Sequence, residues 1–580
     1  MLEDFPRPWL AFSDGLPAEI EIPEQTLSQA VEAAASQYPG NIAIEFLGTT
    51  FTYTRLLKLL GQCAQAFLKL GVREGDSVLL SMPNIPNAVI ALYALNKIGA
   101  RICMTHPLSS KGELRHYVNQ TGSRVVLTID LFYDRFAEML DDHTIDKLIV
   151  AKISDYLPYS KAALFMVTKG RKIQKVPVRP QILEWREFLT SGKGETQKLP
   201  TVNPHTCSVV LFSGGTTSLP KGIELSSYNF EALTVGTEAI SRAVPGDSIL
   251  AILPIFHGFG LGLCVHACLS RGLTVILIPE FNTKNYIDSL IKYKPSFIAG
   301  VPTLFEALMR NKKFAKVRFD HLKAAYCGGD SLYPGIKHRF DEMIMAQGSK
   351  VELKEGYGLT ETVTACIISP DLYKESAMGV PLPNMVAKIV VPDTHEEVPV
   401  GEEGEICVSG PQVMLGYLND PEATKQALHI HKDGGLWLHT GDIGYMDENG
   451  YFFFKSRIKR ILKVSGISVY PVQIEQVLES HPLVFKACVI GIPDDYQMTC
   501  VKAFVVIDPS RPITKTEPEI KNELIEYCKK NLIKWSVPRD IEFRTSLPST
   551  LIGKVSYTAL EQEELQKACS TAAAAVESQA

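Results

Sequence analysis

The sequence has no pair of cysteines with C-x-x-C spacing, although it contains 12 cysteines. Cys264 and Cys268 are the closest two, and both lie in a long apolar stretch. Disulfide frameworks and zinc sites use cysteines at close, regular spacings. We therefore predict buried, reduced thiols rather than a disulfide framework or a zinc site built on these cysteines.

The chain also lacks targeting signals and an excess of positive charge. Its first residues, MLEDFPRPWLAFSDG, are acidic and interrupted by prolines, whereas a signal peptide has a basic start and an apolar run. No window reaches the roughly 18 uninterrupted apolar residues of a membrane span. The net charge of −5 does not favour nucleic-acid binding. We expect a cytoplasmic protein without a nucleic-acid partner.

Length and patterning indicate a globular α/β protein of more than one domain. A chain of 580 residues is too long for a single hydrophobic core. Strand-like runs such as DSVLLSM and SRVVLTI alternate with helix-like segments such as TLSQAVEAAASQ, which is typical of parallel sheets covered by helices. We predict two successive α/β layers, roughly 26–200 and 201–380. After about residue 385, short strands with Gly, Asp and Pro turns predict a small antiparallel barrel or sheet.

A Walker phosphate loop is absent. The stretch LFSGGTTSLPKG (211–222) has several glycines and a lysine, but Pro220 stands where the second Walker glycine belongs. Gly222 stands where the final Ser or Thr belongs. Proline has no N–H to donate, and glycine has no hydroxyl group.

The composition of this stretch nevertheless suits phosphate. Gly214 and Gly215 allow the backbone to approach an anion closely. The side-chain donors are Ser213, Thr216, Thr217, Ser218 and Lys221. The preceding run VVLF predicts a buried strand, so the loop would emerge at a sheet edge, where α/β proteins bind ligands. We predict a phosphate-binding loop rather than a plain flexible turn.

These residues resemble the phosphate loop of the adenylate-forming (ANL) superfamily, which includes acyl-CoA synthetases, peptide-synthetase adenylation domains and beetle luciferases. Gly214 stands where the family usually has Ser, and Ser218 where it usually has Gly. Further stretches that are similar to the family's motifs follow in the family's order: LPIFHGFG, AYCGGDSL, GYGLTE, HTGD, KSRIKRILKVSG and LPSTLIGK. The resemblance covers about residues 26–560. It implies a large N-terminal AMP-binding domain (1–455) of two α/β sheets and a small β-barrel, joined to a small mobile α+β C-terminal domain (456–580).

The resemblance also implies a nucleotide site. Tyr357 would stack on adenine, Asp442 and Arg457 would hold the ribose, Thr360 would meet phosphate and Glu361 would bind Mg²⁺. The remaining nucleotide-binding residues by this resemblance are Ser213, Gly214, Gly215, Thr216, Thr217, Lys221, Gly329, Asp330, Ser331, Gly356, Gly358 and Gly466.

The chemistry that the resemblance implies has two half-reactions. A carboxylate attacks the α-phosphorus of ATP to give an acyl-adenylate and pyrophosphate, and Lys554 would stabilise the developing charge. A thiolate then attacks the adenylate after the C-terminal domain has rotated about a hinge at Lys459. Lys463 and Gly466 would then face the thioester site, and His257 would lie near the acyl pocket.

The acid is expected to be apolar. The stretch GFGLGLCVHACL (258–269) lacks the aspartate that binds the amino group of an amino-acid substrate, and His266 is its only ionisable residue. The stretch that begins SDYLPY is similar to one in bacterial long-chain fatty acyl-CoA synthetases. We expect ATP, Mg²⁺ and CoA to act with a long- or medium-chain fatty acid. The alternatives are an aryl acid such as cinnamate or benzoate, a separate carrier protein in place of CoA, and a catalytically silent adenylate-binding module.

A basic segment stands apart from these motifs. KAALFMVTKGRKIQKVPVRP contains six Lys and Arg residues and no acidic residue, and Leu164, Phe165 and Met166 are interleaved with them. Two interpretations stay open for residues 161–179. The segment is a solvated basic loop, or it is a patch that makes peripheral contact with an anionic membrane surface.

Overall fold

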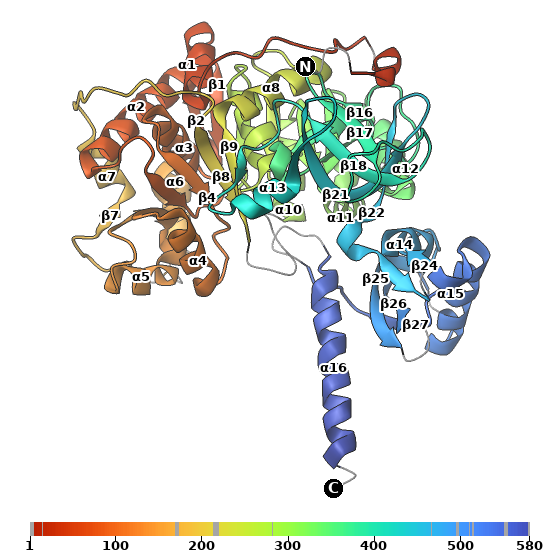
Figure 1. Cartoon of the computed structure of the whole chain (residues 1–580). Helices are drawn as coiled ribbons and strands as arrows, with labels where there is room; N and C mark the ends of the chain where they lie inside the picture. Colours follow the sequence, from red (N-terminus) through yellow and green to blue (C-terminus); the bar gives the residue numbers. More distant parts are fainter. Residues whose placement is uncertain are drawn as a thin grey trace.

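The chain folds into a large body of packed sheets and helices with a smaller group of elements at its C-terminal end (Figure 1). The computed structural model describes residues 5–13, 15–168, 173, 175–212, 220–280, 282–465, 467–494, 498–509, 511–512, 515–549 and 555–577.

The larger sheet of the main body has a parallel centre and antiparallel edges. Its strands, in spatial order, are β16 (Val380–Pro381), β15 (Ala365–Ile368), β14 (Leu353–Gly358), β13 (Ala324–Gly328), β12 (Phe297–Gly300), β10 (Ser248–Ala251), β11 (Thr274–Leu277), β1 (Ile42–Phe46) and β2 (Thr49–Thr52). Parallel pairing runs from β14 to β1, whereas β2, β15 and β16 pair antiparallel. Strand β12 is buried at every residue, as expected for a strand that is covered on both faces.

The second sheet carries the predicted phosphate loop. Its strands, in spatial order, are β19 (Gly416–Tyr417), β9 (Gly222–Ser226), β8 (Cys207–Phe212), β4 (Arg101–Met104), β3 (Ser77–Leu80), β5 (Val125–Ile129), β6 (Lys147–Ala151) and β7 (Ile182–Glu184). Strand β8 contains the predicted buried run VVLF and pairs antiparallel with β9. The phosphate loop therefore connects two neighbouring strands at one side of this sheet.

The two sheets do not divide the chain near residue 200. Strands β1 and β2 lie in the larger sheet because β1 pairs in parallel with β11, with Ile44 opposite Val275. The strands between residues 77 and 184 form the second sheet together with β8 and β9. The prediction of two α/β sheets is thus confirmed, but successive blocks at 26–200 and 201–380 are wrong. Strand β1 is almost wholly apolar, and such a strand is equally compatible with either sheet by its pattern alone.

A third, antiparallel sheet follows, as predicted for the region after residue 385. Its path is β17 (Val386–Val390), β18 (Gly404–Ser409), β21 (Leu436–Met446) and β20 (Leu428–Ile430), and β22 (Phe452–Arg457) also pairs with β21. Its long central strand, β21, carries the HTGD motif at residues 439–442.

The C-terminal elements have hydrophobic cores of their own. Strands β23 (Leu462–Val464) and β24 (Ile467–Val469) form a hairpin, and β25 (Val484–Asp494), β26 (Met498–Ile507) and β27 (Asp540–Arg544) form a small sheet. Helices α14 (Pro471–Glu479) and α15 (Glu517–Asn531) pack on this sheet, and α16 (Tyr557–Glu577) extends away from it (Figure 1). This group of helices and strands matches the small α+β C-terminal domain that the family resemblance implies.

Helices cover both faces of the large sheets (Figure 1). They are α1 (Leu27–Gln37), α2 (Tyr53–Leu70), α3 (Pro86–Lys97), α4 (Lys111–Thr121), α5 (Ala137–Asp141), α6 (Tyr159–Val167), α7 (Trp185–Ser191), α8 (Ser227–Ser241), α9 (Ala267–Leu269), α10 (Thr283–Tyr293), α11 (Pro302–Met309), α12 (Pro334–Ala346) and α13 (Pro421–Ala427).

Capping hydrogen bonds from nearby side chains determine where helices such as α1 begin. At the start of α1 the Thr26 hydroxyl accepts a hydrogen bond from Gln29 N, and the Gln29 side chain accepts one from Thr26 N.

The described residues bear on two expectations from the sequence, buried reduced thiols and the lack of a membrane-spanning segment. Every cysteine whose side chain is described has a free thiol, and most of these thiols are buried. Of the helices that the structure describes, none combines the length and the apolar character that crossing a membrane requires.

Glu355 lies on β14, directly before the predicted nucleotide segment. Burial raises the pKa of the Glu355 carboxyl from 4.5 to about 8, although Leu332 N donates a hydrogen bond to Oε1 at 3.3 Å. A carboxyl with a raised pKa binds its proton more tightly in the folded state than in the unfolded state. Its contribution to stability is therefore complete below pH 4.5 and is lost as the pH rises through about 8.

We predict that Glu355→Gln, which keeps the neutral form, reduces the loss of stability between about pH 6 and about pH 9. The melting temperature of the variant should fall less over this interval than that of the wild type, by on the order of 2 °C or more. Differential scanning calorimetry at both pH values measures this difference. Glu342→Gln, on the exposed side of α12, is the matched control and should follow the wild type. If the melting temperature of Glu355→Gln depended on pH as that of the wild type does, the raised pKa of Glu355 would be contradicted.

Candidate active site

A tight turn follows β14 at the end of the predicted motif GYGLTE. The chain turns at η7 (Thr360–Thr362), and Val363 follows with φ of 63°, which is uncommon for a β-branched residue. Two glycines make room for this turn. A Cβ atom on Gly258 would lie 1.6 Å from the carbonyl oxygen of Val363, and one on Gly358 would lie 1.6 Å from the carbonyl oxygen of Thr364.

His257 is held beside this turn. Its neighbour Gly258 touches the backbone of Val363, and its Nδ1 accepts a hydrogen bond from Phe259 N at 3.2 Å. The π-helical turn η5 (Phe259–His266) begins directly after it, a conformation often found at functional sites. The structure therefore brings the motif of His257 together with that of Thr360.

The carboxylate of Glu361 lies close to the end of the phosphate loop. The hydroxyl of Tyr417 donates a hydrogen bond to Glu361 Oε1 at 2.9 Å. Lys221 Nζ lies 4.9 Å from the centre of the Tyr417 ring and 3.7 Å from Asp420 Oδ2. Burial, and then the charge of Glu361, raise the pKa of Tyr417 well above its usual value, so Tyr417 stays a hydrogen-bond donor. A carboxylate, a phenol and an ammonium group thus share one site.

Three further residues form a second polar cluster. Asp442 on β21 lies opposite Arg457 on β22, and Arg457 Nε is 3.3 Å from Asp442 Oδ1. The Tyr357 hydroxyl donates a hydrogen bond to Asp442 Oδ2 at 2.8 Å. The side chain of Asp442 is 2% exposed and that of Arg457 is 58% exposed, so the guanidinium group reaches solvent above a buried carboxylate. Asp442 raises the pKa of Arg457, and burial followed by Asp442 raises the pKa of Tyr357.

The predicted adenine segment lies next to Tyr357. Gly328, the last residue of β13, pairs with Gly356 on β14, and Gly329 follows with φ of 82°. Asp330 is exposed, and its Oδ1 accepts a hydrogen bond from Ser331 N at 2.9 Å. The structure therefore places these loop residues at the same sheet edge as the GYGLTE motif.

The structure does not bring every predicted residue into this site. Lys463 lies on the hairpin β23–β24, where its Nζ donates a hydrogen bond to Ser468 Oγ at 2.7 Å. Lys459 lies in the exposed turn η8 (Ile458–Arg460), directly after β22. Several predicted residues lie outside the described residues, namely Ser213, Gly214, Gly215, Thr216, Thr217, Ser218, Gly466 and Lys554.

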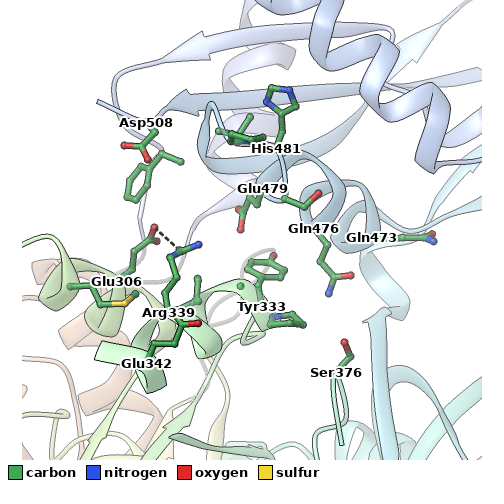
Figure 2. Close-up of a pocket in the computed structure, with 18 of the residues that line it drawn as sticks. Glu306, Tyr333, Arg339, Glu342, Ser376, Gln473, Gln476, Glu479, His481 and Asp508 are labelled. Atoms are coloured by element: carbon green, nitrogen blue, oxygen red, sulfur yellow. Dashed lines mark ion pairs between the residues drawn. The ribbon is translucent and has the colours of Figure 1, made fainter. Parts of the chain in front are cut away.

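A large cavity separates the main body from the C-terminal elements. It has a volume of about 1160 Å³, and Figure 2 shows Tyr333, Arg339 and Glu342 on one side of it with Glu479 and His481 on the other. Charged side chains make contacts across it. Arg310 Nη1 is 3.8 Å from Asp508 Oδ1, and the Arg310 guanidinium lies 3.6 Å from the centre of the Phe485 ring. An interface of this kind permits relative movement of the two parts.

A smaller apolar cavity lies behind the site. It has a volume of about 50 Å³. The residues that line it are Thr234, Thr237, Glu238, Ser241, Ala243, Ile249, Leu263, Ala267, Cys268, Arg271, Leu273, Phe297, Tyr326 and Ile368. The two charged residues of this set, Glu238 and Arg271, pair with each other at 2.9 Å and are both partly exposed. The inner wall of the cavity is therefore apolar or hydroxylic.

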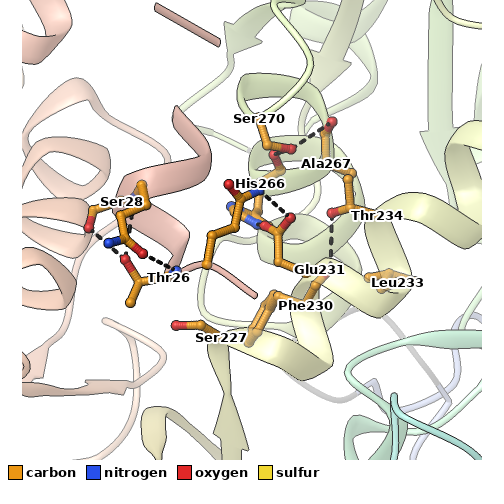
Figure 3. Close-up of polar contacts among 12 residues, drawn as sticks. Thr26, Ser28, Ser227, Phe230, Glu231, Leu233, Thr234, His266, Ala267 and Ser270 are labelled. Atoms are coloured by element: carbon orange, nitrogen blue, oxygen red, sulfur yellow. Dashed lines mark hydrogen bonds and ion pairs between the residues drawn. The ribbon is translucent and has the colours of Figure 1, made fainter. Parts of the chain in front are cut away.

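His266 does not line this cavity, because its side chain is committed to a buried network (Figure 3). Its Nε2 lies 2.8 Å from Glu231 Oε1, and its Nδ1 lies 3.2 Å from the Tyr93 hydroxyl. Gln25 Nε2 donates to the second Glu231 oxygen at 2.9 Å. Both partners of the ion pair are at most 1% exposed. This buried carboxylate is therefore matched by protein groups and does not face the cavity.

Comparison with known proteins agrees with this geometry. A family model described as AMP-binding enzyme matches residues 31–418, and a second, described as AMP-binding enzyme C-terminal domain, matches residues 473–554. The chain belongs to the AMP-binding enzyme family. It is an AMP-forming acid–thiol ligase of the adenylate-forming (ANL) superfamily.

Individual relatives span nearly the whole AMP-binding enzyme. A long-chain-fatty-acid–CoA ligase of Bacillus subtilis is 32% identical over 568 residues, which cover 97% of this chain and 98% of the relative. The structure of an anthranilate CoA ligase, AuaEII, in complex with anthranoyl-AMP has a TM-score of 0.81 at 22% identity and covers 96% of this chain and 99% of its own. ATP-bound MatB from Rhodopseudomonas palustris has a TM-score of 0.78 at 22% identity, with coverage of 93% and 99%. These likenesses confirm the predicted fold class.

Sequence reasoning missed two residues of this AMP-binding enzyme. Tyr417 joins Glu361 to Lys221, but a tyrosine in the two-residue strand β19 gives no sequence signal of that contact. Glu231 provides the buried partner of His266 from α8, outside the stretch 258–269 that the sequence analysis considered. A glutamate in the middle of an otherwise apolar helix stretch, NFEALTVG, was the available signal.

We predict that Asp442→Asn weakens ATP binding by this enzyme, because the amide loses the charge that pairs with Arg457 and would accept hydrogen bonds from ribose. The KM for ATP should rise about tenfold, since a hydrogen bond to a charged group contributes about 1.5–3 kcal/mol. Steady-state kinetics with varied ATP measure this change. Asp393→Asn, in an exposed turn, is the control. An unchanged KM for ATP in Asp442→Asn would contradict the ribose role.

Proposed function

We propose that this enzyme activates a long- or medium-chain fatty acid with ATP and transfers the acyl group to CoA, with release of AMP and pyrophosphate. The observation that supports the nucleotide half most directly is the contact of Glu361 with Tyr417 and of Tyr417 with Lys221 at the end of the phosphate loop. Support for the acid comes from relatives named long-chain-fatty-acid–CoA ligases, which are 31–32% identical over nearly the full length. The apolar cavity has a lining that suits an acyl chain, although at about 50 Å³ the chain would have to displace side chains to enter it.

In the first half-reaction a carboxylate oxygen of the acid attacks the α-phosphorus of ATP, and the bond to the pyrophosphate oxygen breaks. Negative charge on the phosphate oxygens requires cations and N–H donors. We assign this role to Lys554 together with Lys221 and the loop 213–222. The half-buried carboxylate of Glu361 is a hard oxygen ligand beside this loop, which fits Mg²⁺, and Mg²⁺ held there would supply further positive charge.

Nucleoside recognition involves the second polar cluster. We assign Tyr357 to adenine stacking and Asp442 with Arg457 to the ribose hydroxyl groups, since the three side chains contact one another at the edge where β13 and β14 end. Residues 329–331 extend along the same edge.

In the second half-reaction the CoA thiolate attacks the acyl carbon, and AMP leaves. We propose that the C-terminal domain (456–580) turns about Lys459 between the two steps and presents Lys463 and Gly466 to the thioester site. The exposure of Lys459 and the large cavity between the two parts support such a movement. The main body (1–455) would stay fixed.

The same site could act on another acid than a fatty acid, and could transfer the acyl group to another thiol than CoA. A separate carrier protein presents the same pantetheine thiol as CoA, and an aryl acid could occupy part of the apolar cavity. The fatty acid is favoured because the only charged residues that line the cavity, among those described, pair with each other at its exposed side.

We also propose that the segment 161–179 makes peripheral contact with anionic membrane surfaces. Helix α6 at its start exposes apolar side chains, with Leu164 63% and Val167 56% exposed, and Tyr159 just before the segment is 98% exposed. Basic side chains surround these residues in the sequence. Sedimentation with anionic lipid vesicles checks this contact, and absence of binding at low salt would argue against it.

We predict that Lys554→Ala separates the two half-reactions. Formation of acyl-adenylate from ATP and fatty acid should fall about 100-fold, because a positioned cation is lost from the developing charge. Reaction of synthetic acyl-adenylate with CoA should stay near the wild-type rate. Single-turnover assays of each half measure the two rates, with Lys530→Ala on α15 as the control. An equal loss in both halves would contradict the role of Lys554.

We predict that Ala267→Leu shortens the preferred acid. Ala267 lines the apolar cavity, and at about 50 Å³ this space holds little more than one water-sized group, so a longer acyl chain must displace side chains there. A leucine would fill the space and oppose this movement. The kcat/KM for palmitate should fall about tenfold or more relative to that for hexanoate. Ala346→Leu, exposed on α12, is the control, and an unchanged ratio in Ala267→Leu would exclude this cavity as the acyl site.

A further inference from the structure

Four histidines gather on the antiparallel third sheet, and one of them, His439, is the first residue of the HTGD motif. His395 lies in the connection between β17 and β18, His429 lies on β20, His431 follows β20, and His439 lies on β21. Three separate chain segments thus supply imidazole groups to one place. The sequence HIHKDGGLWLH (429–439) was the available signal, and an analysis of cysteine spacing alone could not detect it.

The ring nitrogens of these histidines face one another. His431 Nε2 lies 3.0 Å from His439 Nε2, and His395 Nε2 lies 3.0 Å from His429 Nδ1. The rings of His395 and His431 are stacked, with centres 4.3 Å apart and planes 12° apart. One ligand nitrogen from each of His395, His431 and His439 lies within 4.8 Å of the other two. Tetrahedral ligands at about 2.0–2.1 Å from a metal lie roughly 3.3 Å apart, so the nitrogens must draw closer and one of the two stacked rings must turn to point its nitrogen at the ion.

The outer nitrogens of two of these rings have protein partners. His439 Nδ1 lies 2.8 Å from Glu405 Oε2, and Glu405 is buried. His429 Nε2 lies 3.2 Å from the carbonyl oxygen of Gln426. Histidines that bind metals generally donate their second N–H to a carboxylate or a backbone carbonyl group, which fixes the tautomer and leaves the inner nitrogen free. This is the arrangement around His439 and His429.

The most buried of these ligands is His431, which is 4% exposed. Its Nε2 faces His439, and its Nδ1 has no hydrogen-bond partner among the described residues. His395 and His429 are partly exposed and leave an entry path from solvent. The nearby Lys388 ammonium is paired with Asp433 at 2.9 Å and with Glu397 at 3.2 Å, which offsets its repulsion of a cation.

We propose that His395, His431 and His439 bind one divalent transition-metal ion of the zinc, cobalt, nickel or copper class, with His429 or a water molecule at the fourth position. Imidazole ligands select these ions, whereas Mg²⁺ takes oxygen ligands such as the carboxylate of Glu361. The two metal sites would therefore differ in ligand chemistry and in place.

A metal ion at this site would tie together the β17–β18 connection, β20 and β21. His439 and Asp442 belong to the same motif on β21, and Glu405 contacts both His439 and Gly441 N, the latter at 2.9 Å. The ion would thereby stiffen the strand that carries the proposed ribose carboxylate. Its role would be structural, because none of its ligands is assigned to the reacting groups.

The test is Co²⁺ binding to the full chain after removal of metals with EDTA and exchange into chelator-free buffer. We expect one equivalent of Co²⁺ to give the visible absorption of a tetrahedral nitrogen site, to be displaced by one equivalent of Zn²⁺, and to raise the melting temperature. The double variant His395→Ala/His431→Ala should bind Co²⁺ about 100-fold more weakly. His338→Ala, which removes an exposed histidine from α12, should bind as the wild type does.

Two outcomes would overturn the proposal. One is the absence of stoichiometric Co²⁺ binding to the wild type, and the other is equal binding by the wild type and the double variant. If the double variant fails to fold by circular dichroism, the single variant His395→Gln, at the partly exposed position, replaces it. Unchanged Co²⁺ affinity and absorption in His395→Gln would then contradict the assignment. Co²⁺ binding is measured without ATP or a carboxylic acid. The result is therefore independent of the proposed reaction.

Discussion

The backbone turn after GYGLTE can exist only because two glycines leave room for it. The carbonyl groups of Val363 and Thr364 occupy the space in which side chains of Gly258 and Gly358 would begin. Val363 itself adopts a backbone conformation that costs on the order of 1–3 kcal/mol and must be held by its surroundings. This close packing holds the LPIFHGFG motif, which contains His257, against the GYGLTE motif, which contains Glu361. The other contacts of the site depend on where these two motifs lie.

From this turn the site extends in two directions. Tyr417 reaches Glu361 from a short strand that pairs with β9, which brings the end of the phosphate loop to the carboxylate. Tyr357 reaches Asp442 on the third sheet, which also carries the histidine cluster. The candidate site thus lies where the two α/β sheets and the antiparallel sheet meet. The C-terminal elements contact this body through Arg310, which lies against Asp508 and the Phe485 ring, and through Lys486, which lies over Tyr333.

Local patterns predicted much of the fold, and longer-range contacts escaped them. The buried strand before the phosphate loop and the antiparallel region were predicted, because apolar periodicity and turn residues act over short distances. Pairing of β1 with β11 was not predictable, since any buried strand fits either sheet. Motif order located Glu361, Asp442 and Arg457. Tyr417 and the histidine cluster depend on contacts between distant segments, which one sequence does not reveal.

The reaction is tested most directly by AMP release from ATP and Mg²⁺, measured with and without CoA. The acids are butyrate, octanoate, palmitate and oleate, with cinnamate and benzoate for comparison. Strong AMP release that requires both CoA and a medium- or long-chain fatty acid is the expected result. Pyrophosphate exchange that CoA does not convert into thioester, or preference for cinnamate or benzoate over every fatty acid, would contradict the proposed ligase.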